Sequence, residues 1–110
     1  MGRRTILDSL IQFNAPVAEL EAALATLTWD NDPAITLTRR HVIAVLEQFA
    51  NASIDAATVE EWANLVESRD DIQFEAGHEG TIAAAIHDLA NPVLQGQLVN
   101  LVPGILSSLR

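Results

Sequence analysis

The residues best suited to acid–base catalysis or cation binding lie between Glu67 and His78, a segment that also contains Asp70, Asp71 and Glu75. A pair of carboxylates performs acid–base catalysis or binds a cation when a cleft desolvates one of its members. Nothing in the sequence forces either aspartate to be buried. The acids therefore have two simpler interpretations: a patch that is only solvated, and a patch that faces a partner protein.

The three histidines, His41, His78 and His87, are the other candidate metal ligands. Positions 78 and 87 are about half a turn out of phase on one helix, so their side chains point to opposite faces. No HExxH-like spacing is present. An EF-hand loop beginning at Asp30 fails as well, because its glycine position is Ile35 and its glutamate position is His41. We predict that no metal is needed and that the histidines lie at the surface or at helix ends.

The side chains of covalent catalysis are largely missing. The chain contains no cysteine, tyrosine or lysine, and it shows neither a glycine-rich phosphate loop nor a Ser-His-Asp signature. The absence of cysteine also excludes a disulfide framework and thiolate metal sites. We therefore expect a protein that is not an enzyme and that uses no cofactor.

Length and composition favour a single domain, residues 1–110, that buries its own core. The chain is 49% hydrophobic, which argues against disorder. It has no apolar run of about 18 residues that would span a membrane, and its first residues do not read as a signal peptide. We expect residence in the cytoplasm and no contact with a membrane.

The balance of charge limits the class of partner. Fifteen acids against six basic residues give a net charge of −9. Such a surface repels nucleic acid and anionic lipid, and it attracts basic proteins. Acidity that serves only to keep the protein in solution is the simpler alternative.

The segment 58–74 organises the predicted fold. Its apolar residues Val59, Trp62, Ala63 and Val66 follow the i, i+3, i+4, i+7 spacing of one helical stripe. The opposite side of the same helix carries Glu60, Glu61, Asn64 and Glu67. One helix therefore combines a buried tryptophan with an acidic outer face.

The same periodicity elsewhere predicts an all-α domain of five or six short helices. The tail after Pro92 should cover the core as one helix with a break near Pro103, because proline interrupts a helix. Residues 35–37 alternate like a strand, but without an evident second strand we expect an extended connector. The predicted core contains Leu10, Leu20, Leu24, Val45, Leu46, Phe49, Trp62, Val66, Ile82, Ile86 and Leu89.

An ordered series of short motifs covers about half of the chain. It begins at Trp29-Asp30 and continues through Leu37-Thr38-Arg39, His41-Val42, Val45-Leu46-Glu47, Val59-Glu60-Glu61-Trp62-Ala63-Asn64, Arg69-Asp70-Asp71-Ile72, Phe74-Glu75 and Leu89-Ala90-Asn91-Pro92. This series resembles the CdiI-type immunity proteins of contact-dependent growth inhibition, a group of small bacterial proteins. The chain departs from the group at Asn51-Ala52-Ser53, where a turn with glycine is expected.

The resemblance implies a non-catalytic inhibitor that binds the toxin domain of a cognate effector and neutralises it in the cytoplasm. Such toxins are commonly nucleases, which are basic because they bind phosphate backbones. An acidic inhibitor matches that charge. We expect the partner to contact Glu60, Glu61, Glu67, Asp70, Asp71, Glu75 and Asp30.

Two other classes of function stay open. A small acidic adaptor or regulatory module would bind its partner through an exposed apolar groove. An enzyme would need a deep pocket that holds two of the residues Asp70, Asp71, Glu75 and His78.

Overall fold

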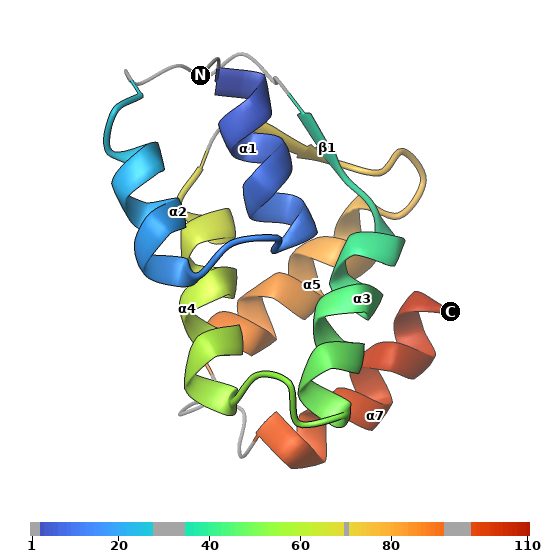
Figure 1. Cartoon of the computed structure of the whole chain (residues 1–110). Helices are drawn as coiled ribbons and strands as arrows, with labels where there is room; N and C mark the ends of the chain where they lie inside the picture. Colours follow the sequence, from blue (N-terminus) through green and yellow to red (C-terminus); the bar gives the residue numbers. More distant parts are fainter. Residues whose placement is uncertain (1–2, 28–34, 70, 92–97) are drawn as a thin grey trace.

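The computed structural model describes residues 3–27, 35–69, 71–91 and 98–110. The predicted all-α class is confirmed, and the described residues form six helices and one very small sheet (Figure 1). In chain order the elements are α1 (Arg3–Gln12), α2 (Val17–Leu24), β1 (Ile35–Leu37), α3 (Arg39–Ala50), α4 (Ala56–Glu67), β2 (Ile72–Phe74), α5 (Glu79–Ala90) and α7 (Leu98–Leu109).

Trp62 of α4 lies at the centre of the core, fully buried as its spacing predicts. Its indole Nε1 donates a hydrogen bond of 2.7 Å to the carbonyl oxygen of Leu10, which joins α4 to α1. A buried indole N–H needs such a partner, because an unsatisfied donor is expensive in an apolar interior. Ten of the eleven predicted core residues lie in the cluster of buried residues, and the eleventh, Phe49, is partly buried and packs against that cluster.

The residues 35–37 form a true strand, so the expected extended connector is wrong. Strand β1 pairs in parallel with β2, and Thr36 lies opposite Gln73. The side-chain amide of Gln73 donates to the Thr36 hydroxyl at 2.8 Å. The backbone N–H of Glu75 donates to the carbonyl of Leu37 at 2.9 Å, which extends the backbone pairing by one residue. A pairing between segments so distant in sequence leaves no local signal.

Helix α7 passes through Pro103 without the predicted break. Proline removes one backbone hydrogen bond from a helix. Helix α7 nevertheless packs against two other helices, α3 and α5 (Figure 1). The four buried residues of α7 are Leu98, Val102, Ile105 and Leu109. Tertiary packing therefore outweighs the local preference of proline, as it commonly does.

The turn between α3 and α4 contains no glycine, and hydrogen bonds to an asparagine side chain stabilise it instead. Ala52 adopts a positive φ of 65°, and the side chain of Asn51 accepts hydrogen bonds from the backbone and the hydroxyl of Ser53, at 3.1 and 2.6 Å. The left-handed conformation disfavours any residue with a Cβ atom. The asparagine turn holds Ala52 in a strained position.

Candidate functional site

The acids predicted to face a partner have different environments. Asp71 is fully buried. Its Oδ1 accepts from Nε of Arg69 at 3.0 Å and its Oδ2 from the other guanidinium nitrogen at 2.7 Å. The guanidinium of Arg3 lies 3.5 Å from Oδ2. Asp71 thus lies inside the fold and not on the surface, where a partner was expected to contact it, and its carboxylate ties the start of α1 to the segment that follows α4.

The charge state of Asp71 follows from these contacts. Burial alone raises the pKa of a carboxyl, but the hydrogen bonds and charge of Arg69, together with the charge of Arg3, outweigh burial and hold the pKa of Asp71 below 3.8. The carboxylate is thus ionised and matched by two basic groups. It is unsuited to the role of a proton-sharing catalytic acid.

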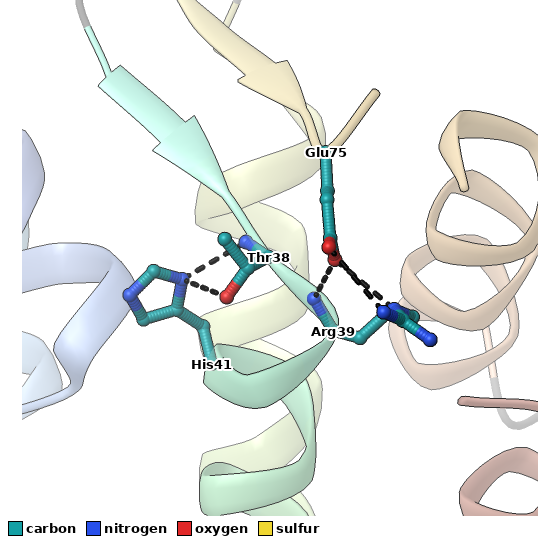
Figure 2. A network of polar contacts seen from close by, with 4 residues as sticks. All are labelled: Thr38, Arg39, His41 and Glu75. Carbon is teal, nitrogen blue, oxygen red and sulfur yellow. Dashed lines mark hydrogen bonds and ion pairs between the residues drawn. The ribbon is translucent and has the colours of Figure 1, made fainter. Parts of the chain in front are cut away.

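Glu75 lies just beyond β2 and caps helix α3 (Figure 2). Its Oε1 accepts from the backbone N–H of Arg39 at 3.0 Å and from the Nε of the same residue at 3.1 Å. The hydrogen bonds from Arg39 keep the pKa of Glu75 below its usual value. A carboxylate at the start of a helix satisfies an otherwise unpaired N–H and matches the helix dipole. Glu75 is thus engaged within the fold.

Glu67 contacts a histidine at the surface. Its Oε2 lies 3.2 Å from Nδ1 of His87, and both side chains are about half exposed. The pair joins the last turn of α4 to α5, whose end is closed by Asn91 donating to the carbonyl of His87 at 2.8 Å. Glu67 therefore remains accessible to a partner, although its carboxylate already contacts the His87 imidazole.

Glu60 and Glu61 remain available on the outer side of α4. Glu61 is exposed and Glu60 half-buried, and Asn64 is exposed on the next turn. Within the described part of the chain no ion pair or side-chain hydrogen bond engages either glutamate. The two remaining predicted acids, Asp30 and Asp70, lie outside the described residues.

Sequence reasoning missed a groove around His41. Four elements line this cavity of about 680 Å³: α1, β1, β2 and α3. Its polar walls are formed by Arg4, Thr5, Asp8, Thr36, His41 and Gln73, and its apolar walls by Ile11 and Ile35.

The imidazole in this groove has a fixed orientation (Figure 2). The backbone N–H of Thr38 donates to Nδ1 of His41 at 2.9 Å, and the Thr38 hydroxyl lies 3.0 Å from the same atom. Burial lowers the pKa of His41 below 6.5, against the opposing effect of the Asp8 carboxylate. His41 occupies the position that glutamate or glutamine takes in the usual capping box. In the sequence, only the three-residue spacing from Thr38 to His41 indicates that these two side chains cap α3 together.

The other two histidines lie near the ends of α5, as predicted: His78 is the residue before its first turn, and His87 is in its last turn. Across the ranges that the structure describes, no group of three or more histidine, aspartate or glutamate side chains is placed to hold a metal ion. None of the described helices is both long enough and apolar enough to cross a membrane.

Comparisons of the chain with models of protein families, with curated proteins and with solved structures gave no match.

Proposed function

We propose that this protein is a non-catalytic immunity protein that binds and neutralises the basic toxin domain, commonly a nuclease, of a cognate contact-dependent growth inhibition effector. The single observation that carries the proposal is the outer side of α4, where Glu60 and Glu61 have no ion pair among the described residues. Unpaired carboxylates on a rigid helix attract a basic partner without first breaking bonds within the protein.

The proposed interface is narrower than the sequence suggested. Asp71 and Glu75 are excluded from it because each carboxylate is already held by arginine. Glu67 borders it, since this residue is half exposed beside His87. The contact surface then follows the outer side of α4 through Glu60, Glu61 and Asn64, away from the stripe that buries Trp62.

Charge reversal tests this interface. The variant with Glu60→Lys and Glu61→Lys should fold as the wild type does, because Glu61 is exposed, Glu60 is only half-buried, and surface substitutions usually shift stability by less than about 0.5 kcal/mol. Its affinity for the toxin domain should fall by at least about tenfold, since close charge pairs at interfaces contribute roughly 1.5–7 kcal/mol. The association rate of the wild type should fall as salt rises, because the Debye length is about 10 Å at 0.1 M.

The matched control is the variant with Glu19→Lys and Glu21→Lys, which reverses two exposed acids on α2 and changes the net charge equally. We expect this control to keep most of the affinity. Equal losses in both variants would show that only total charge matters, and unchanged affinity in the α4 variant would refute the interface.

One observation favours the adaptor as a second candidate. Helices α5 and α7 enclose an apolar groove of about 570 Å³ lined by small side chains and by Leu101 and Ile105. Nearby on α7, Val99 is 61% exposed. An adaptor that uses this groove would lose its partner in a Leu101→Asp variant and keep it after charge reversal on α4. A toxin inhibitor that uses α4 would respond in the opposite way.

A further inference from the structure

The groove around His41 has its polar groups arranged as a donor wall and an acceptor wall. Because the backbone N–H of Thr38 must donate to Nδ1, the proton of neutral His41 is on Nε2. Figure 2 shows this second nitrogen pointing away from Thr38, on the side of the ring that faces α1. The imidazole therefore presents a fixed N–H donor to the groove.

The acceptor wall is Asp8 on α1. Its side chain lines the same groove as His41, and no hydrogen bond joins the two side chains among the described residues. The one side-chain bond of Asp8 in that set is a long one, 3.4 Å, from the amide of Gln12. The carboxylate thus has unused acceptor capacity on the side of the groove.

A hydroxyl group matches the hydrogen-bonding capacity of these two walls. Its oxygen accepts one hydrogen bond while its hydrogen is donated in another, so a single hydroxyl can bridge the Nε2–H donor and the carboxylate. The side chains of Thr5, Thr36 and Gln73 add further polar partners around the same space. The apolar walls, Ile11 and Ile35, suit the C–H face of a sugar ring or polyol chain.

We propose that this groove binds a small, hydroxyl-rich, uncharged molecule, a sugar or polyol, with His41 and Asp8 as the central pair. The volume is in the range typical of small-molecule sites, roughly 300–1,000 Å³. His41 binds the ligand without acting as a base, because the lone pair of its Nδ1 already accepts a hydrogen bond from the backbone N–H of Thr38. The groove lining carries one cation and one anion, Arg4 and Asp8, and this balanced charge favours an uncharged ligand. The site is independent of the proposed toxin interface, since α4 contributes no residue to its lining.

Nuclear magnetic resonance of the whole protein tests the site, with D-ribose, D-glucose and myo-inositol as probes and inorganic phosphate as the anionic comparison. At least one of the three polyols should shift the His41 imidazole signals in a saturable way. Asp8→Asn should weaken that binding by about tenfold or more, because a hydrogen bond to a charged group contributes roughly 1.5–3 kcal/mol. Asp88→Asn, a half-buried aspartate on α5 away from the groove, is the matched control and should bind as the wild type does.

Three results would overturn the proposal. They are no saturable shift of His41 with any polyol, an equal affinity in Asp8→Asn with its melting temperature unchanged, and a stronger response to phosphate than to the polyols. The Thr38 amide signal reports whether the imidazole stays in place in Asp8→Asn, which separates loss of a ligand contact from loss of the cap.

Discussion

Replacing Asp71 by asparagine should destabilise the protein strongly, although the two side chains have nearly the same shape. The substitution removes the charge that two arginines share and turns one carboxylate oxygen into an N–H donor facing a guanidinium. Removing one partner of a buried ion pair costs roughly 3–5 kcal/mol. Arg69 and Arg3 keep 11% and 22% of their side-chain exposure, so we expect the lower end, about 3 kcal/mol.

That loss is large for a protein of this size. Small domains unfold with a total of about 5–15 kcal/mol, and each kcal/mol shifts the melting temperature of a domain near 100 residues by roughly 4–8 °C. We therefore expect Asp71→Asn to melt at least about 12 °C below the wild type in a thermal scan near pH 7. The control Asp88→Asn should melt within a few degrees of the wild type.

The pH dependence gives an independent check. Since the pKa of Asp71 is below 3.8 in the folded protein, the ionised carboxylate stabilises the fold above that pH, and its contribution is lost as pH falls through the folded pKa. The difference between wild type and Asp71→Asn should therefore shrink below about pH 3.8. A variant that melts with the wild type at pH 7 would refute the buried-pair account.

Substitutions at three further positions test the rest of the fold. Trp62→Ala should lower the free energy of unfolding by about 3–5 kcal/mol, and Trp62→Phe by about 2 kcal/mol because the Leu10 carbonyl loses its donor; equal melting of all three proteins would contradict the central role of the indole. Ala52→Gly should raise the free energy of unfolding by about 1 kcal/mol, since glycine adopts a positive φ without strain; a lower melting temperature would argue against strain at that turn. The lowered pKa of His41 means that its neutral form stabilises the fold, so stability should fall as pH drops below 6.5. In His41→Gln, which keeps a capping side chain, that part of the pH dependence of unfolding should disappear; an unchanged acid slope would refute the role of His41.

The parts of the fold that depend on local sequence could be predicted. The stripe containing Trp62 placed α4 and its buried face correctly, because helical periodicity acts within a few residues. The outer side of the same helix follows from the same periodicity: Glu61 is exposed as predicted, and Glu60 beside it is half-buried. These are the acids on which the proposed function now depends.

The features that the sequence did not predict are contacts between segments distant in the chain. Asp71 follows a helix of exposed acids and looks like one of them, yet Arg3 from the other end of the chain helps to bury it. Glu75 meets Arg39 only because β2 pairs with β1. The groove around His41 needs four elements to come together before it exists. Spacing along the chain carries no information about the contacts of Asp71 with Arg3 or of Glu75 with Arg39, and for the groove it indicates only the cap formed by Thr38 and His41.

The most direct measurement is a titration of this protein against the purified toxin domain of the proposed cognate effector, in which calorimetry measures binding and a separate assay measures the activity of the toxin. The proposal predicts a one-to-one complex, a toxic activity that falls to zero as the complex forms, and an affinity that Glu60→Lys with Glu61→Lys weakens while Glu19→Lys with Glu21→Lys does not. A wild-type protein that neither binds the toxin domain nor reduces its activity would contradict the proposed function.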